Sequence, residues 1–321
     1  MPSVTLKNQI QMPLLGFGVL RMKDPEECER CVEAALDAGY RMFDTAASYG
    51  NEEAVGRALN RAVKAGKVRR DELFVITKLW ITDAAEALAR QGFETSLRKL
   101  QMDYIDLYLI HQPYRDYYGA WRTLEKLYRE DLARAIGVSN FSPERLVDLC
   151  MNTEIPPMVN QIELHPFYHQ DRAIKVMREL GVQPQAWAPL CEGLKNIFSN
   201  RTLEKVGKKY GKSAAQTALR WNIDRQVSVV LRSSQREHME EDMGLWDFQL
   251  SEADQKAIDP LDLGYSEILD YENPCIARMF NQCCRKGETE RGDGINSSLS
   301  NPGVNTGQQI ENSQDIRFRL Y

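Results

Sequence analysis

Four side chains that can exchange or polarise a proton follow three short apolar runs of the sequence. Asp44 and Tyr49 follow the first run, Lys78 the second and His111 the third. A carboxylate, a phenol, an amine and an imidazole at one place make a proton-transfer site, yet the set has no evident nucleophile. It is therefore suited to protonating an oxygen atom while another group attacks the carbon.

The chemistry of these four groups is mutually supportive. A free phenol, with a pKa of about 10, is a poor acid at neutral pH. A Lys78 ammonium beside Tyr49 would stabilise the phenolate and lower the pKa of the phenol. Asp44, by pairing with Lys78, would keep the ammonium charged in a dry pocket. A neutral His111 could donate a hydrogen bond to a carbonyl oxygen and polarise it for attack.

The elements that must bring these side chains together alternate regularly along the chain. Helix-like runs alternate with short apolar or β-branched runs that end in a polar residue. The expected strands cover 13–18, 41–44, 73–77, 104–110, 133–138, 158–162, 183–188 and 226–231, and the expected helices cover 26–38, 51–64, 84–100, 119–129, 143–151, 171–180, 201–210 and 237–243. Eight strand–helix units in about 250 residues predict an α/β fold, a closed (β/α)8 TIM barrel, with an N-terminal β-hairpin before it and a C-terminal loop and tail after it.

Cap residues mark several of the expected helix ends. Gly39 follows the first helix and is expected to be its C-cap, because glycine adopts the left-handed conformation readily. Asn51 is expected to cap the next helix. Gly211 and Ser213 indicate a helix end followed by a serine cap.

In such a barrel the C-terminal ends of all strands meet at one mouth, where active sites lie. The residues that close the expected strands, or follow them, are Asp44, Tyr49, Lys78, His111, Ser139, Asn140, Gln161, Trp187, Arg232 and Ser233. Strands far apart in the sequence thus direct the acid, the phenol, the amine and the imidazole toward one mouth.

Two other folds for nucleotide binding fit the sequence less well. Gly16 and Gly18 give a GxG after an apolar run, as in a Rossmann fold, but Arg21 stands at the place of the third glycine. The stretch 211–213 looks like half of a phosphate loop, but Val206 stands where the earlier glycine is required.

Composition excludes several classes of protein. A net charge of -5 and a pI of about 5.6 offer no basic surface for nucleic acid or anionic lipid. The sequence has no run of eighteen apolar residues and no signal peptide, so we expect a cytoplasmic protein without a membrane partner. Seven scattered cysteines fit a reducing compartment, and we expect thiols. No metal site is expected: the pairs that come closest are Cys28 with Cys31, Cys283 with Cys284, and His165 with His169.

The last part of the chain differs in composition from the rest. Residues 287–315 are rich in Gly, Ser, Asn and Glu, which predicts disorder. We therefore expect a barrel domain over 1–275 and a largely disordered extension over 276–321.

The motifs that carry these residues resemble those of the aldo-keto reductase family over about residues 4–275. The matching stretches are GFG at 16–18, GYRMFDTAASYGNEEAVGRAL at 39–59, KLW at 78–80, LIHQP at 109–113, GVSNF at 137–141, NQIELHP at 160–166 and WAPL at 187–190. The resemblance implies reduction of an aldehyde or ketone by hydride from NADPH, with Tyr49 as the catalytic acid. Gln112, after the histidine, is nearer the bacterial and protist branch of diketogluconate and prostaglandin F reductases.

The resemblance also implies a set of cofactor-binding residues. These are Ser139, Asn140 and Gln161 at the nicotinamide carboxamide, Trp187 stacked on the ring, Pro189 and Leu190 beside it, Arg232 and Ser233 at the 2′-phosphate, and His238, Glu241 and Asp242 around the phosphate and adenine. Two positions depart from the family pattern. His238 stands for a second arginine, which weakens the preference for NADPH and allows NADH, and Asp242 stands for Asn and loses a donor.

The substrate pocket is less clear from the sequence. By the resemblance it is lined by Val19, Leu20, Trp80 and Tyr114, and its ligand is a small-molecule carbonyl compound. We expect a monomer. The alternative hypothesis is a cofactor-binding barrel that is not catalytic and acts as a regulatory or structural protein, as some relatives in this family do.

Overall fold

Eight short parallel strands close into a barrel in the computed structural model, which describes residues 1–282. They are β3 (Leu15–Gly18), β4 (Met42–Asp44), β5 (Phe74–Leu79), β6 (Leu107–Ile110), β7 (Ile136–Ser139), β8 (Val159–Glu163), β9 (Gln183–Trp187) and β10 (Ser228–Leu231). Their order around the barrel follows the chain, and β10 pairs with β3 to close it. The predicted (β/α)8 barrel is confirmed.

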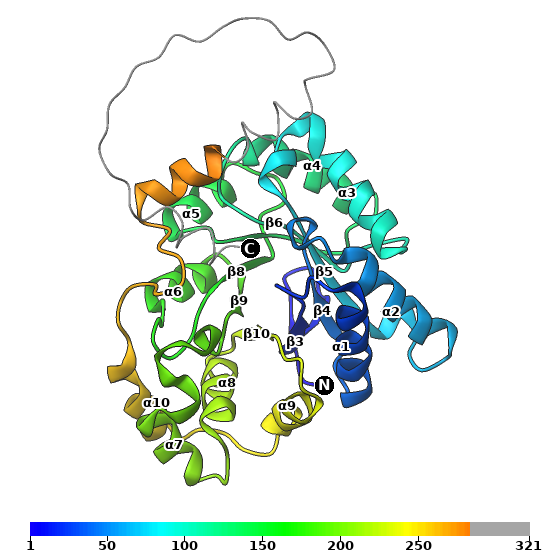
Figure 1. Cartoon of the computed structure of the whole chain (residues 1–321). Helices are drawn as coiled ribbons and strands as arrows, with labels where there is room; N and C mark the ends of the chain where they lie inside the picture. Colours follow the sequence, from blue (N-terminus) through cyan, green and yellow to red (C-terminus); the bar gives the residue numbers. More distant parts are fainter. Residues whose placement is uncertain (283–321) are drawn as a thin grey trace, which may run out of the picture. The chain divides into compact units, whose positions relative to one another are not determined.

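Helices surround this ring of strands (Figure 1). They are α1 (Pro25–Ala38), α2 (Glu52–Lys64), α3 (Glu86–Leu100), α4 (Tyr117–Arg129), α5 (Pro143–Met151), α6 (Asp171–Glu179), α7 (Arg201–Lys208), α8 (Ala214–Asp224), α9 (Arg236–Asp242) and α10 (Glu252–Ile258), with 3-10 turns η1 (Ala47–Tyr49), η2 (Arg70–Glu72), η3 (Ile81–Asp83), η4 (Cys191–Ser199), η5 (Met243–Leu245) and η6 (Asp259–Leu261). Because helices cover the sheet outside and side chains fill it inside, β5 (FVITKL) and β6 (LYLI) are buried at every position.

The parallel register sets the height of the residues at the mouth. Lys78 of β5 lies opposite Leu109 of β6, two residues before His111. Asp44 of β4 lies opposite Ile76, two residues before Lys78. From β4 to β6 each polar residue is thus staggered by two positions, the kind of stagger that accompanies strand tilt in a closed barrel, and all three lie at its C-terminal mouth.

Two details of the first expected strand were wrong. Pro13 belongs to β2 (Gln11–Pro13), which pairs with β1 (Ser3–Thr5) in an antiparallel hairpin, and the barrel strand begins only at Leu15. The carbonyl of Pro13 accepts from the Ser228 hydroxyl at the start of β10 (3.0 Å). The hairpin thus attaches to the end of the barrel opposite the mouth.

Helices α8 and α10 were missing from the sequence-based prediction. Helix α8 is buried on almost every side, so its sequence lacks the one-sided apolar stripe by which amphipathic helices are recognised. Helix α10 has only seven residues, EADQKAI, of which two are buried. Neither helix carries a strong periodic signal.

The cap predictions had mixed outcomes. Gly39 has a φ of 108° at the end of α1, as expected, and Ser213 starts α8 with a capping box that includes Gln216. Asn51 stands at the N-cap position of α2, but its side chain makes no cap hydrogen bond. It is instead buried in the loop that carries Tyr49.

The chain divides into two compact units, Met1–Glu267 and Ile268–Tyr321. The first unit contains the hairpin and the whole barrel. In the second, residues 274–282 are helical. Most of the predicted disordered extension, 283–321, lies outside the described residues, as do Cys283 and Cys284. That domain division stays a prediction.

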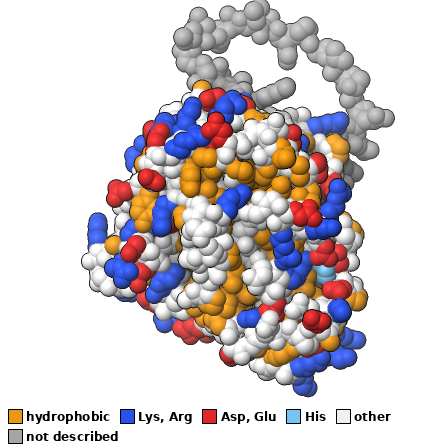
Figure 2. Space-filling model, turned by 180° about the vertical axis from the view of Figure 1, so that it is seen from behind, with side chains coloured by type: hydrophobic (Ala, Val, Ile, Leu, Met, Phe, Trp, Pro, Cys, Tyr) orange, Lys and Arg blue, Asp and Glu red, His pale blue; other side chains and the backbone are white. Residues whose placement is uncertain are grey.

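The described part of the chain has a surface of mixed charge and cysteines that form no disulfide bond. Figure 2 shows Lys and Arg side chains interspersed with Asp and Glu on the face that it draws. Within residues 1–282, no helix is long and apolar enough to cross a bilayer. The five cysteines of this part are free thiols.

We predict that Gly56→Ala destabilises the barrel. A Cβ added to Gly56 of α2 would lie 2.5 Å from the carbonyl oxygen of Leu100, where α3 ends. The helices would have to separate, and overpacking of this kind lowers the free energy of unfolding by about 1 to 3 kcal/mol.

Urea unfolding of the two proteins measures this difference. The control is Glu53→Ala on the exposed face of the same helix, for which we expect a change within about 0.5 kcal/mol. Equal unfolding midpoints for Gly56→Ala and the control would contradict a close approach of α2 and α3.

Candidate active site

A buried lysine lies at the centre of the barrel mouth. Lys78 has no exposed surface, and its Nζ donates to Asp44 Oδ1 (2.6 Å), to the carbonyl oxygen of Thr45 (3.0 Å) and to the Tyr49 hydroxyl (3.2 Å). An ammonium group has three donors and no acceptor. All three N–H groups of Lys78 are therefore used, and two of the three acceptors come from residues that the sequence singled out.

Hydrogen bonds of the Asn51 side chain hold the loop that carries Tyr49. The Asn51 amide accepts from the Thr45 hydroxyl (2.8 Å) and donates to the carbonyl oxygens of Val19 (2.8 Å) and Met22 (3.1 Å). Because Asn51 serves these bonds, it does not cap α2. The phenol is thereby held in a loop that is itself tied to the neighbouring β3 loop.

Asp44 outweighs the effect of burial on Lys78. Burial alone lowers the pKa of an amine, because the charged form loses its hydration. Here the attraction of Asp44, with a contribution from Tyr49, raises the pKa of Lys78 above its ordinary value. Lys78 is therefore a cation at neutral pH, as the sequence predicted.

The expected fall in the pKa of Tyr49 was wrong in its net direction. Burial raises the pKa of the phenol; Lys78 lowers it, Asp44 raises it further, and the net pKa is raised. Lys78 acts in the expected direction, but the degree of burial cannot be read from the sequence. At neutral pH the phenol thus keeps its proton, which is the form a proton donor needs.

His111 follows β6 beside the phenol. Burial, together with the charge of Lys78, holds the pKa of His111 well below its usual value, so the imidazole is neutral. Its ring lies edge-on to the rings of Tyr49 (5.6 Å between centroids) and Trp80 (5.1 Å). The structure therefore brings all four proton-handling residues to one place.

Gln161 of β8 links this group to the opposite wall of the barrel. Its Nε2 donates to Asp44 Oδ2 (2.8 Å) and to Gln185 Oε1 (2.7 Å). Both hydrogens of the amide nitrogen are thus used. The Oε1 of Gln161 accepts no hydrogen bond from residues 1–282, so a ligand N–H has an acceptor there.

The other residues expected at a nicotinamide lie at the ends of β7 and β9. The indole Nε1 of Trp187 donates to Asn140 Oδ1 (2.8 Å), and Asn140 Nδ2 donates to Ser139 Oγ (3.1 Å). Ser139 in turn donates to the carbonyl oxygen of Gln161 (2.9 Å). A half-exposed aromatic surface is thus held next to the proton-handling residues. Pro189, which is buried, and Leu190, which is half-buried, follow in the loop after β9.

The residues expected at the phosphate and adenine fall into exposed and buried groups. Arg232, His238 and Glu241 are exposed, and Arg232 forms no ion pair within the described chain. Ser233 is half-exposed, and its hydroxyl donates to the carbonyl of Gln235 (3.0 Å). Asp242 is buried, and burial, with the charge of Glu241, raises its pKa to about 7. An unpaired guanidinium fits a phosphate group.

The four expected substrate residues differ in exposure. Leu20 is exposed and Trp80 is half-buried beside His111. Tyr114 is mostly buried, and Val19 has no exposed surface. A side chain with no surface contacts a ligand only if the wall moves, so Val19 is the least suited of the four to line a pocket.

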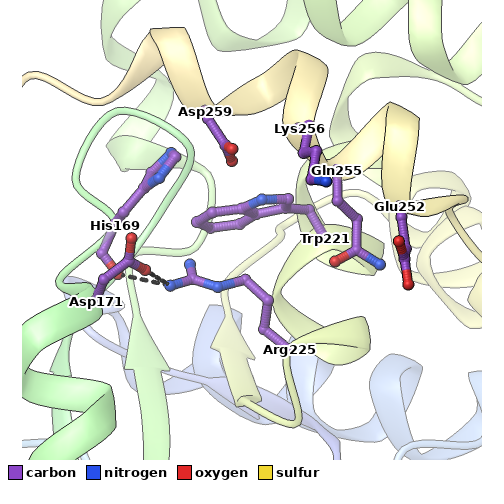
Figure 3. A pocket seen from close by; sticks show the side chains of 8 residues that line it. All are labelled: His169, Asp171, Trp221, Arg225, Glu252, Gln255, Lys256 and Asp259. Atoms are coloured by element: carbon purple, nitrogen blue, oxygen red, sulfur yellow. Dashed lines mark hydrogen bonds and ion pairs between the residues drawn. The ribbon is translucent and has the colours of Figure 1, made fainter.

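Figure 3 shows a pocket between α6, α8 and α10. None of the candidate-site residues described above lines this pocket. Its lining residues are His169, Asp171, Trp221, Arg225, Glu252, Gln255, Lys256 and Asp259. Arg225 pairs with Asp171 and donates to the His169 carbonyl (3.0 Å), and its guanidinium lies 4.1 Å from the Trp221 ring centroid. These contacts join α6 to α8. The guanidinium of Arg225, the group best suited here to bind an anion, is thus already engaged within the fold.

Three contributors to the site were missed from the sequence. They are Thr45, whose carbonyl accepts from Lys78, Gln185, which holds Gln161, and Ser48, whose hydroxyl lies 3.3 Å from His111 Nδ1. A backbone carbonyl carries no sequence signal, and Gln185 lies in the middle of a strand. Ser48 directly precedes the phenol, but a serine in a polar loop carries no specific signal of its own.

The sequence analysis named the residue pairs that come closest to a metal site. Within residues 1–282, no group of three or more His, Cys, Asp or Glu side chains is arranged to hold a metal ion. Cys28 and Cys31 lie on α1, and burial raises the pKa of Cys28 to about 12. His165 is bonded to Glu163 (3.0 Å).

Comparison with known proteins gives a consistent result. The model of the Aldo/keto reductase family matches residues 14–263. The chain is 42% identical over 266 residues to methylglyoxal reductase DkgA of Yersinia pestis, covering 82% of this chain and 94% of that protein. It is 40% identical over 260 residues to a 9,11-endoperoxide prostaglandin H2 reductase of Trypanosoma cruzi, covering 80% and 90%. A crystal structure of the Bombyx mori aldo-keto reductase in complex with NADP has a TM-score of 0.79 and 32% identity, covering 84% and 95%.

We predict that Lys78→Met strongly destabilises the fold. It leaves the buried Asp44 carboxylate without its cation, and breaking a buried pair in this way costs about 3 to 5 kcal/mol of unfolding free energy. Chemical denaturation followed by fluorescence measures the loss.

The double variant Asp44→Asn/Lys78→Met is the matched control. It removes both charges, so we expect it to be more stable than Lys78→Met alone. The loss of unfolding free energy in the double variant is compared with the losses in Asp44→Asn and Lys78→Met. If it equalled their sum, the two groups would not interact.

Proposed function

The chain belongs to the aldo/keto reductase family, and we propose that it reduces aldehydes or ketones to alcohols with NADPH, with Tyr49 as the proton donor. Family membership and the named reductases among its relatives support an oxidoreductase, and by their names these bacterial and protist relatives act on carbonyl compounds or an endoperoxide. The observation that supports the proposal most is the Lys78 Nζ, 2.6 Å from Asp44 and 3.2 Å from the Tyr49 hydroxyl.

The proposed reaction divides into two transfers. A bound nicotinamide cofactor supplies the hydride that adds to the carbonyl carbon. As negative charge develops on the carbonyl oxygen, the Tyr49 hydroxyl gives it a proton. The phenolate that remains is stabilised by the Lys78 ammonium, and it regains its proton from water. Because Lys78 is already charged and positioned, no side chain has to reorganise during the step.

The neutral imidazole has a different part. His111 has no imidazolium proton to give at neutral pH, because its pKa is held well below the usual value and the ring is neutral. It can donate one N–H to the carbonyl oxygen and fix its direction toward Tyr49. Trp80, edge-on to the imidazole at 5.1 Å, supplies an apolar wall on the same side. We therefore assign orientation of the substrate to His111 and Trp80.

The described side chains fit a nicotinamide cofactor. Gln161 has an open carbonyl acceptor, and Ser139 and Asn140 lie directly beside it. Trp187, held by its bond to Asn140, would stack on the nicotinamide ring. At the far end, Arg232 and Ser233 would hold the 2′-phosphate, with His238 and Glu241 exposed nearby.

NADPH is the favoured form of the cofactor because Arg232 is exposed and unpaired among the described residues. A guanidinium binds phosphate through two parallel hydrogen bonds. His238 lacks the forked donors that a second arginine would offer to the phosphate, so the preference rests mainly on one arginine. NADH would bind the same site with the loss of that contact.

The non-catalytic alternative is less well supported. A barrel that only bound the cofactor would not require a buried lysine with all three donors committed to the loop of the phenol. Burying that charge is costly unless it is fully paired, and its pairing here includes the hydroxyl of Tyr49. We therefore favour the enzyme.

Tyr49→Phe should abolish most of the turnover of a reactive aromatic aldehyde. The substitution removes the proton and keeps the ring, so we expect kcat to fall by about 100- to 10,000-fold. The affinity for NADPH, measured by the quenching of tryptophan fluorescence, should remain unchanged. The decrease of NADPH absorbance gives the rate.

Tyr128→Phe on α4 is the control, because it removes a phenol hydroxyl away from the site. We expect this variant to be as active as the wild-type protein. If Tyr49→Phe consumed NADPH as fast as this control, Tyr49 would not be the donor.

Arg232→Ala should weaken NADPH selectively. Loss of one charged phosphate contact corresponds to about a 10- to 100-fold rise in the Kd for NADPH, with the Kd for NADH nearly unchanged. Arg236→Ala is the matched control, because Arg236 is also exposed but is paired with Glu240 at 2.7 Å. Equal effects of Arg232→Ala on the two cofactors would mean that the 2′-phosphate binds elsewhere.

A further inference from the structure

The side chain of Ser48 contacts the imidazole of the candidate site from the side of the phenol loop. Its Oγ lies 3.3 Å from His111 Nδ1, and Ser48 is the residue directly before Tyr49 in η1. The Nε2 of His111 makes no hydrogen bond with residues 1–282. One ring nitrogen thus has a protein partner and the other is left for a ligand.

A neutral imidazole carries one proton, on either Nδ1 or Nε2. The two tautomers present opposite chemistry to a ligand at Nε2: one donates a hydrogen bond, and the other can only accept one. A carbonyl oxygen is an acceptor, so only the Nε2–H tautomer can bind it. Which tautomer is present is set by the hydrogen bond at the other nitrogen.

The remaining neighbours of the ring do not make this choice. Tyr49 and Trp80 pack edge-on against the imidazole and set the plane of the ring. Asn140 Nδ2 donates to the backbone carbonyl of His111 (3.1 Å) and so holds the main chain. Among the described residues, only Ser48 forms a hydrogen bond with a ring nitrogen.

Burial, with the charge of Lys78, holds the pKa of His111 well below its usual value, so the ring does not carry a second proton. In a neutral ring the bond to Ser48 has two possible directions, and one of them leaves a donor at Nε2. A serine hydroxyl rotates freely and can donate to the lone pair of an unprotonated Nδ1. With Nδ1 as the acceptor, the single proton of the neutral ring is on Nε2.

We propose that Ser48 is a positioning residue that donates its hydroxyl hydrogen to His111 Nδ1 and thereby holds the imidazole in the Nε2–H tautomer. This inference rests on the proposed function for its purpose, since the Nε2–H group would orient a carbonyl oxygen. Its physical content, the tautomer of one histidine, is independent of any reaction.

Nitrogen NMR tests the tautomer directly in the whole protein. Long-range ¹H–¹⁵N correlation spectra distinguish the two nitrogens of each ring, and the chain has only four histidines. His111→Asn identifies the resonances of His111. His169 is an internal reference, because its Nε2 lies 3.0 Å from the Pro166 carbonyl, which only accepts, and so carries the proton.

We expect His111 of the original chain to show the Nε2–H pattern, like His169. Ser48→Ala should shift the ring toward a mixture of tautomers, and Ser48→Thr, which keeps the hydroxyl, should restore the original pattern. A Nδ1–H pattern in the original chain would overturn the proposal without the need for any variant. An unchanged pattern in a folded Ser48→Ala would overturn it too.

Kinetics then connects the tautomer to the reaction. Loss of one neutral hydrogen bond predicts a roughly 3- to 10-fold fall in kcat/KM for Ser48→Ala, an unchanged Kd for NADPH and recovery with Ser48→Thr. An equal loss in Ser48→Ala and Ser48→Thr would contradict the role of the hydroxyl. If the protein reduced no carbonyl compound, the proposed function would be wrong, but the proposal for Ser48 would not be affected. The NMR measurement of the tautomer does not depend on turnover.

Discussion

A single buried ammonium group organises the mouth of this barrel. A charge without access to water is destabilising unless every donor finds a partner, and Lys78 finds three: Asp44, the Thr45 carbonyl and the Tyr49 hydroxyl. Those partners lie at the end of β4 and in the loop after it. The loop conformation is thus tied to the charge on β5, and Gln161 extends the same network from Asp44 across the barrel.

Much of the fold could be predicted from the sequence, because eight apolar runs separated by helical periodicity have few other arrangements. The failures have physical causes. The run 104–110 is apolar except for Asp106, yet β6 covers only Leu107–Ile110, since apolar character marks burial and not the onset of pairing. Helix α8 was missed because burial on almost all sides removes the periodicity that marks a surface helix.

The candidate site was predicted in its residue types but not in its energetics. Asp44, Lys78 and His111 lie around Tyr49 as the barrel register requires. The sign of the pKa shift of Tyr49 could not be derived, because it depends on burial, which is a property of the packed mouth. The contact of Ser48 with the imidazole depends in the same way on how a short 3-10 turn presents its side chains.

Direct observation of the Lys78 amine is the most immediate test of this account. In ¹⁵N-lysine-labelled protein, the Nζ resonance that is absent from Lys78→Arg belongs to Lys78. The account requires a protonated amine at neutral pH that stays protonated to about pH 10, because Asp44 raises its pKa above the ordinary 10.5. An amine that is neutral at pH 8 would remove the cation on which Tyr49 depends.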